Sequence, residues 1–121
     1  MRPPVSDQET SGECIQYVLD RCDYIYDVIV LLHPTSPIRD PAHIDQAITQ
    51  LVHSEAPSLA SVECRKRTYT HNASIYAVKR LAFKGEHYTD QSIPFLMDAP
   101  HSIDIDTEHD FRVAEFYLNA R

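Results

Sequence analysis

The sequence predicts an α/β domain built in three layers, with amphipathic helices on both faces of a sheet. Segments with helical periodicity alternate along the chain with short apolar segments of strand length. The run from Ile29 to Leu32 is apolar at every position, which is typical of a buried strand in a parallel sheet. With 121 residues, the chain is long enough for a single domain, 1–121, and a modest core.

The first half of the chain contains a helix, a strand and a second helix. Residues 9–22 form a helix, since an apolar stripe recurs in them at helical spacing. Residues 25–32 form the apolar strand. Asp40 followed by Pro41 is a typical helix start and predicts a helix over 41–53.

The second half begins with three strand candidates. We expect strands over 58–64 and 74–79 and a short strand over 93–97. Residues 65–71 are basic and polar, and 80–91 shows no decisive pattern. Within the first of these stretches, Arg65, Lys66 and Arg67 form either a solvated loop or a phosphate-binding patch.

The last helix begins at Asp106 or Thr107, where Thr107 and Asp110 form an imperfect capping box. One face of this helix is apolar and is expected to pack on the domain. The apolar positions are Phe111, Val113, Ala114, Phe116 and Leu118.

The predicted sheet has few strands. A buried central strand over 25–32 needs a neighbour on each side, and the chain supplies few candidates. The sheet is therefore either incomplete or completed by another chain.

The composition argues against several classes of partner. Lys and Arg number 11 against 18 Asp and Glu, which gives a formal net charge of −7. Nucleic acids and acidic membrane surfaces bind basic faces, so neither is expected as a partner. An anionic substrate would need a metal ion or a local cationic patch.

The cysteines and the apolar segments predict a compartment. Cys14, Cys22 and Cys64 are odd in number and lack Cys-x-x-Cys spacing, which indicates free thiols in a reducing compartment. No apolar stretch is long enough to span a bilayer, and no apolar core of a signal peptide follows Met1. We therefore expect a cytoplasmic protein.

The run Ser102–Asp110 is the most informative candidate site. Asp104 and Asp106 are two residues apart on a strand-like segment, so both carboxylates leave the same face of the backbone. They repel each other unless a cation lies between them, which suits Mg²⁺ with its preference for oxygen ligands. The alternative is that they are only a loop residue and a helix cap.

The loop 33–39 is the second candidate. Its two prolines make it stiff, so that Thr35, Ser36 and Arg39 are presented on a rigid turn. Arg39 could meet a carboxylate or phosphate of a ligand, or pair with an acidic side chain of the protein. His33 at the strand end is either a structural histidine or a functional one.

These motifs match a known pattern in order. Arg2–Leu19 contains an Arg-Pro segment and a helix. Residues 31–39 read Leu-Leu-His-Pro-Thr-Ser-Pro-Ile-Arg, and residues 72–76 read Asn-Ala-Ser-Ile-Tyr. Residues 102–111 begin Ser-Ile-Asp-Ile-Asp-Thr-Glu. Together the blocks resemble the CMP-N-acylneuraminate (CMP-sialic acid) synthetase family of cytidylyltransferases.

The resemblance implies a Rossmann-like nucleotidyltransferase fold. It also implies a reaction in which CMP passes from CTP to a sialic-acid-type sugar acid and pyrophosphate is released. Asp104 and Asp106 would hold Mg²⁺, the implied cofactor. Arg2 and Ser11 match positions that touch the nucleotide.

The resemblance also implies a sugar pocket. The substrate-binding positions that it suggests are Thr35, Ser36, Asn72 and Tyr76, although Tyr76 could equally be a core residue. His33 is the candidate catalytic residue, and metal activation of the sugar hydroxyl is an alternative to a protein base.

The chain departs from the family in several places. The N-terminal strand and its glycine-rich nucleotide loop are absent. His33 replaces a glutamine, Ala73 replaces a glycine, and the stretch between Cys64 and Asn72 is much shorter. We therefore expect a truncated domain that corresponds to the C-terminal portion of such an enzyme.

Two functional hypotheses remain. The first is a cytidylyltransferase-like enzyme with CTP and an acidic sugar as ligands. The second is a non-catalytic remnant, or a sugar- or metal-binding module completed by a partner. A homodimer or a partner chain that supplies the missing N-terminal half would fit the incomplete sheet.

Overall fold

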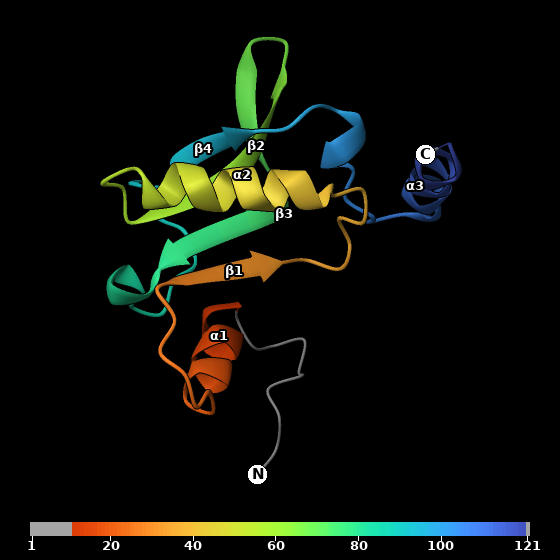
Figure 1. Ribbon diagram of the computed structural model, residues 1–121. Helices are drawn as coiled ribbons and strands as arrows, with labels where there is room; N and C mark the ends of the chain where they lie inside the picture. Colours follow the sequence, from red (N-terminus) through yellow and green to blue (C-terminus); the bar gives the residue numbers. More distant parts are fainter. Residues whose placement is uncertain (1–10, 121) are drawn as a thin grey trace.

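The computed structural model describes residues 11–120, except for the side chains of Arg65 and Ala73. These residues form four strands, three α-helices and two short 3₁₀ helices, whose arrangement is drawn in Figure 1. Their bounds are α1 Ser11–Leu19, β1 Val28–Leu32, α2 Pro41–Val52, β2 Ser58–Arg65, β3 Thr68–Lys79, η1 Arg80–Ala82, β4 Ile93–Leu96, η2 Pro100–Ser102 and α3 Glu108–Asn119. The predicted order of helices and strands is confirmed.

The four strands form one mixed sheet in the order β1-β3-β2-β4. β3 pairs antiparallel with both β1 and β2, and β2 pairs parallel with β4. The prediction that residues 29–32 form a central strand of a parallel sheet is therefore wrong. Within residues 11–120, β1 is an edge strand with an antiparallel neighbour.

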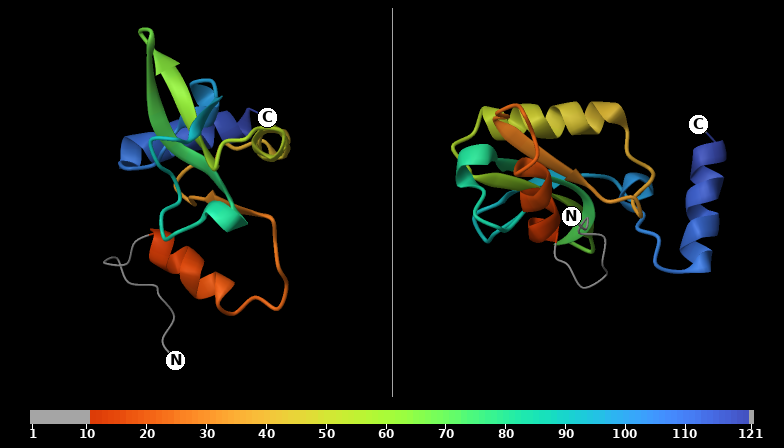
Figure 2. Two further views of the ribbon diagram at one scale, coloured as in Figure 1. Left: turned by 90° about the vertical axis from the view of Figure 1, so that its left-hand side faces the viewer. Right: turned by 90° about the horizontal axis from the view of Figure 1, so that it is seen from below.

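Helices nevertheless cover both faces of β1, which explains its apolar pattern. Val28 and Val30 pack against the cluster under α2, whereas Ile29 and Leu31 pack against the cluster that includes Ile15 of α1. Figure 2 shows α1 and α2 on opposite sides of the sheet. The α/β class is as predicted. The apolar pattern of β1 reflects the coverage of both its faces, which does not require a neighbouring strand at each edge.

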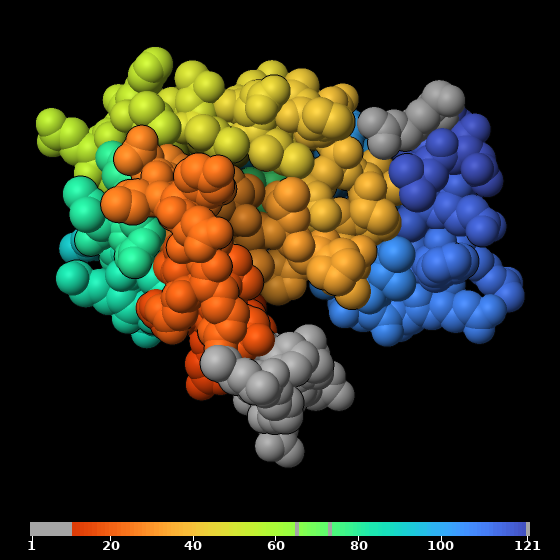
Figure 3. Space-filling view, turned by 60° about the horizontal axis from the view of Figure 1, so that its bottom comes forward, coloured from red at the N-terminus to blue at the C-terminus, as the bar shows by residue number. Residues whose placement is uncertain are grey.

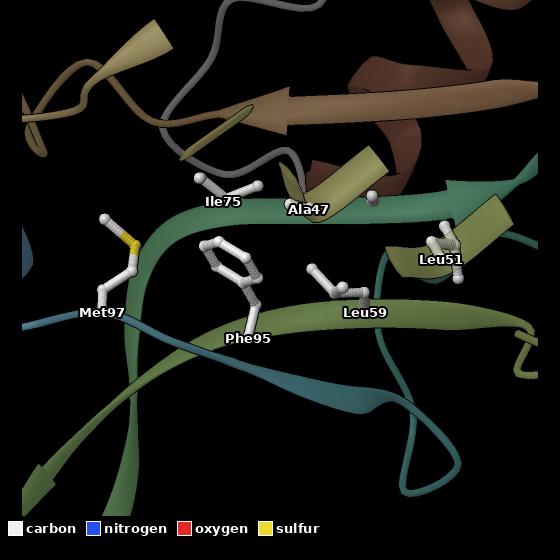
Figure 4. Close-up of a cluster of buried hydrophobic side chains, with 7 residues drawn as sticks. Ala47, Leu51, Leu59, Ile75, Phe95 and Met97 are labelled. Atoms are coloured by element: carbon white, nitrogen blue, oxygen red, sulfur yellow. The ribbon is translucent and has the colours of Figure 1, made fainter. Parts of the chain in front are cut away.

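The main core lies between α2 and the sheet (Figure 4). Leu51, Leu59 and Ile75 are fully buried there. The complete cluster is Ala47, Leu51, Leu59, Ile75, Ala77, Phe95 and Met97. α2 starts where the sequence predicts, because the side chain of Asp40 accepts a hydrogen bond from the Ala42 N–H and Pro41 takes the first helical position.

The hairpin between β2 and β3 differs from the prediction. β3 is longer than the predicted strand over 74–79, since it starts at Thr68, and β2 extends to Arg65. The connection consists of Lys66 and Arg67, which are exposed and adopt positive φ angles of 50° and 66°. Such a two-residue turn matches the twist of a hairpin but usually contains Gly or Asn, so the residues Lys66 and Arg67 do not indicate it.

The last helix also differs from the prediction. Thr107 is the N-cap, and a capping box with Asp110 is present as expected. The apolar face of α3, however, stays largely exposed: Phe111 is 55 % and Phe116 68 % exposed, and only Ala114 is buried. Figure 1 shows α3 to one side of the sheet, joined to it by an extended segment.

Candidate functional site

A cleft of about 530 Å³ lies between the sheet and the start of α3. β2 and β3 supply one wall, and the segment that follows η2 supplies the other. The lining residues are Glu63, His71, Asn72, Ser102, Ile103, Asp104, Asp106, His109, Asp110 and Val113. The cleft thus combines several carboxylates with two imidazoles.

Asp104 and Asp106 both line this cleft. Asp104 is half-buried, and its Oδ1 atom is buried without a hydrogen-bond partner, whereas Asp106 is exposed. The Ile105 N–H between them donates to the Thr35 carbonyl over 2.7 Å. The two residues belong to no strand of the sheet, so the predicted strand end is wrong, but the contact with Thr35 fixes the segment.

Asn72 joins three parts of the fold at the floor of the cleft. Its Oδ1 atom accepts hydrogen bonds from the Ser61 hydroxyl at 2.5 Å and the Ser74 N–H at 3.1 Å. Its Nδ2 atom donates to the Ser102 Oγ atom at 2.9 Å. Asn72 is predicted as a ligand contact, but its buried amide is used mainly to hold η2 on the sheet.

A bulge in β3 explains why these polar side chains are buried. Ala60 pairs with Tyr76 and Val62 pairs with His71, so residues 72–75 lie opposite Ser61 alone. Main-chain pairing is interrupted there, and side chains take its place. The Ser61 hydroxyl accepts from the Ile75 N–H at 2.8 Å, as buried backbone donors require.

The loop 33–39 is held from inside by Arg39. Its Nη1 atom donates to the His33 carbonyl at 2.7 Å and to the Ser74 carbonyl at 3.1 Å. Burial lowers the pKa of the Arg39 guanidinium. Arg39 therefore fastens the loop to β3 through main-chain carbonyls. Ser36 is buried and Thr35 exposed.

A cluster of histidine and tyrosine rings lies beside the cleft. The ring centroid of Tyr76 is 4.6 Å from that of His87, 5.3 Å from Tyr88 and 5.7 Å from His33. His71, which also lines the cleft, has its ring 4.9 Å from Tyr88. We call these five residues the ring cluster.

Two members of the ring cluster, Tyr76 and His87, have shifted pKa values. Burial raises the pKa of Tyr76, and the nearby Tyr88 and Asp104 raise it further. Burial lowers the pKa of His87, and the charge of His33 adds to this effect, while Glu86 opposes it. Asp104 of the cleft therefore acts on Tyr76 of the ring cluster, although less than burial does.

The structure brings some of the predicted site residues together. Asn72, Asp104 and Asp106 line the cleft, and His33 and Tyr76 belong to the adjoining ring cluster. Ser36 and Thr35 lie on the tethered loop. The remaining two predicted residues are Ser11, at the start of α1, and Arg2, which lies outside the described residues.

Sequence reasoning missed part of the region. His71 belongs to a stretch that was described only as basic and polar, and His87 and Tyr88 belong to one without a decisive pattern. Only their position on the folded chain groups them with Tyr76, and no local spacing signals that grouping.

The site fits a magnesium ion in its donor atoms. Within residues 11–120, no three His, Cys, Asp or Glu side chains converge to form a complete set of metal ligands. Mg²⁺ is commonly held by only one or two carboxylates together with water and substrate oxygens. The unpartnered oxygen of Asp104, with Asp106 on the same cleft, is suited to that kind of binding.

Comparison with known proteins gives no family for this chain: no family model matches it, and no curated protein is significantly similar to it. A search of the described part of the chain for helices long and apolar enough to cross a membrane found none. The chemistry of the site must therefore be argued from its residues.

Proposed function

We propose that this chain is a cytidylyltransferase-like protein with a Rossmann-like fold. It would transfer CMP from CTP to a sialic-acid-type sugar acid in the cleft beside α3. The observation that favours this function is the buried, unpartnered Oδ1 atom of Asp104 on the same cleft as Asp106. A carboxylate oxygen that is buried without a donor is costly unless a cation or a ligand satisfies it.

Asp104 and Asp106 would hold Mg²⁺, which supplies charge neutralisation to phosphoryl transfer when it is bound. The net charge of the chain, −7, makes such a cation more important, because the protein as a whole repels an anionic substrate. The extended segment that bears both carboxylates is held by Thr35 through the Ile105 N–H.

His33, in the ring cluster beside the cleft, is the proposed base that takes a proton from the sugar hydroxyl. Its Nε2 atom is buried without a hydrogen-bond partner, while Arg39 fixes its backbone carbonyl. A neutral imidazole nitrogen in this state can accept a proton. Tyr76, beside His33, would close the apolar side of the pocket.

Calorimetric titration with Mg²⁺·CTP, with and without sialic acid, tests the proposal. Asp106→Ala should abolish binding, because it removes a metal ligand that makes no side-chain contact required by the fold. Asp45→Ala is the matched control, since Asp45 is an exposed carboxylate on α2 and should leave binding unchanged. Pyrophosphate release on adding sialic acid would then demonstrate transfer.

A folded chain that binds neither Mg²⁺ nor Mg²⁺·CTP would refute the enzyme proposal. Equal loss of binding in the Asp106 and Asp45 variants would show that the metal is not held in this cleft.

A second function is favoured by one observation. Among the described residues that line the cleft there is no lysine or arginine, so this wall offers no cation to a triphosphate. We therefore retain the alternative of a non-catalytic or partner-completed module that binds a metal and a sugar acid. Metal-dependent binding of sialic acid without binding of CTP would identify this alternative.

A further inference from the structure

The turn between β4 and η2 is closed by one residue, Asp98. Its Oδ1 atom accepts hydrogen bonds from the His101 N–H at 3.1 Å and from the Nδ1 atom of the His101 ring at 2.5 Å. Its main-chain carbonyl accepts a hydrogen bond from the Ser102 hydroxyl at 2.6 Å. Asp98 therefore binds the last two residues of η2.

The His101 ring is held from two sides. An ionised carboxylate only accepts hydrogen bonds, so the Nδ1 atom of His101 carries the hydrogen that Asp98 accepts. Burial acts to raise the pKa of Asp98, but hydrogen bonds from His101 and the charges of His101 and His43 outweigh it, so that the pKa lies below its ordinary value of 3.8. On its other side, the ring packs edge-on against the His43 ring of α2, with the centroids 4.7 Å apart.

Both ends of the turn are anchored to the sheet. On the β4 side, the Met97 N–H donates to the Val62 carbonyl of β2 at 2.8 Å, and Met97 belongs to the main core. On the η2 side, the Asn72 Nδ2 atom donates to the Ser102 hydroxyl at 2.9 Å. The turn that Asp98 closes thus connects two fixed points of the fold.

Asp104 follows directly on this anchored turn. Only Ile103 separates it from Ser102 at the end of η2. On its other side, the Ile105 N–H donates to the Thr35 carbonyl at 2.7 Å. In Figure 3, the loop 33–39, in amber, lies against the blue C-terminal part of the chain. The backbone that bears the Asp104 carboxylate therefore has little freedom.

We propose that Asp98 and His101 are positioning residues for the metal site of the cleft: the hydrogen bond between their side chains fixes η2, and η2 sets where the Asp104 carboxylate lies. The role rests on the proposed function, because the ion is the Mg²⁺ of that site. Neither Asp98 nor His101 lines the cleft. Their effect passes through the main chain of 102–104, as for other groups that pre-organise a site from outside it.

A turn cap without influence on the metal is the alternative role of this pair. The Asp98 side chain is 63 % exposed and that of His101 26 %, so neither belongs to the core. Loss of the hydrogen bond between them should therefore leave the domain folded. Metal affinity and stability can then be measured separately on the same variants.

Titration of the full chain with Mn²⁺, followed by the electron paramagnetic resonance of the free ion, tests the proposal. Mn²⁺ accepts the same oxygen ligands as Mg²⁺. His101→Phe keeps a ring beside His43 but removes the Nδ1–H donor. It should weaken Mn²⁺ binding by about fivefold, the effect of losing one hydrogen bond that holds the ligand segment. The circular dichroism of the variant should remain that of the folded wild type.

His101→Asn is the rescue variant, because an amide N–H can donate to Asp98 in place of Nδ1. It should bind Mn²⁺ within about twofold of the wild type. Asp98→Ala is the second disrupting variant, and adding His101→Phe to it should weaken binding no further, since both remove the same hydrogen bond. Asp45→Ala is the matched control, because it removes an exposed carboxylate from α2 and reports the effect of charge alone.

The outcomes separate the positioning role from the proposed function. If the wild type binds Mn²⁺ and Asp106→Ala does not, the metal site stands, and unchanged binding by folded His101→Phe and Asp98→Ala would overturn the positioning role alone. Equal weakening in His101→Phe and His101→Asn would also overturn it, because the hydrogen bond would then not be the cause. A folded wild type that binds no Mn²⁺ would refute the metal site itself and the positioning role with it.

Discussion

At the scale of single residues, Asn72 decides how the cleft is built. Its amide replaces the main-chain pairing that the bulge at 72–75 interrupts, and it fastens Ser102 to the sheet. This structural use leaves one amide hydrogen for a ligand. Asn72 therefore influences binding mainly by positioning the segment that bears Asp104.

Asn72→Ala should reduce the free energy of unfolding by about 2 kcal/mol, because it leaves the Ser61 hydroxyl and the Ser74 N–H buried without their partner. Urea denaturation followed by circular dichroism measures the change. Thr70→Ala, an exposed position of the same strand, is the control and should change stability by less than about 0.5 kcal/mol. Equal effects of the two substitutions would contradict a special role of Asn72.

Gly12 is required by a close approach between α1 and the turn at Gly85. A Cβ atom at Gly12 would lie 1.8 Å from the Gly85 carbonyl oxygen. Gly85 itself has φ +97°, a conformation that suits glycine. The chain's two glycines therefore meet, and together they set the position of α1 beside the ring cluster.

Gly12→Ala should destabilise the protein by about 1–3 kcal/mol, because α1 or the turn must move to admit the methyl group. Helix propensity alone would give the opposite sign, a gain of about 1 kcal/mol. The sign of the change in thermal denaturation therefore decides between packing and propensity. Gln16→Ala, on the exposed face of α1, should have little effect.

At the scale of helices and strands, α3 is the least supported part of the fold. It buries only Ala114, so its stability depends on its own capping box rather than on packing. The Thr107 side chain accepts from the Asp110 N–H, and the Asp110 carboxylate accepts from the Thr107 N–H, both at 3.1 Å.

Thr107→Ala should fray α3 at a local cost of about 1 kcal/mol without lowering the melting temperature of the domain. Faster amide exchange over 110–114, with unchanged exchange in β3, measures this effect. Glu115→Ala, in the exposed middle of the helix, is the control. A fall in the melting temperature would show instead that α3 is cooperative with the sheet.

Helix starts could be predicted from the sequence, whereas the β2–β3 turn could not. The Asp40-Pro41 start of α2 and the Thr107 cap of α3 were predictable because capping chemistry is local. The turn at Lys66 and Arg67 was not, since neither residue type usually adopts a positive φ. The first half of β3 was missed with it, because the two strands form a single hairpin.

At the scale of the whole molecule, the sequence predicted that both faces of β1 are covered but not which strands are adjacent in the sheet. The apolar pattern of β1 records that both of its faces are covered, and it contains no information on which strand lies beside it. The candidate site likewise has a part that could be predicted from local sequence and a part that could not. Asp104 and Asp106 are close in sequence and were predicted, whereas the ring cluster joins β3 to residues 33, 87 and 88 and depends on the complete fold.

The ring cluster should make the stability of the domain depend on pH. Burial lowers the pKa of His87 below its ordinary value of 6.5, and the charge of His33 lowers it further, so the unfolded chain binds a proton more readily than the folded chain. The stabilisation is therefore complete above pH 6.5 and is lost as the pH falls through the lower folded-state pKa. The lowered pKa values of Asp98 and Asp110 act in a more acidic range, below 3.8.

Urea denaturation between neutral pH and the folded-state pKa of His87 should show a falling midpoint in the wild type and a flatter profile in His87→Gln. His53→Gln, on an exposed helix end away from the ring cluster, should retain the wild-type slope. A profile that His87→Gln leaves unchanged would place the pH-sensitive group elsewhere in the fold.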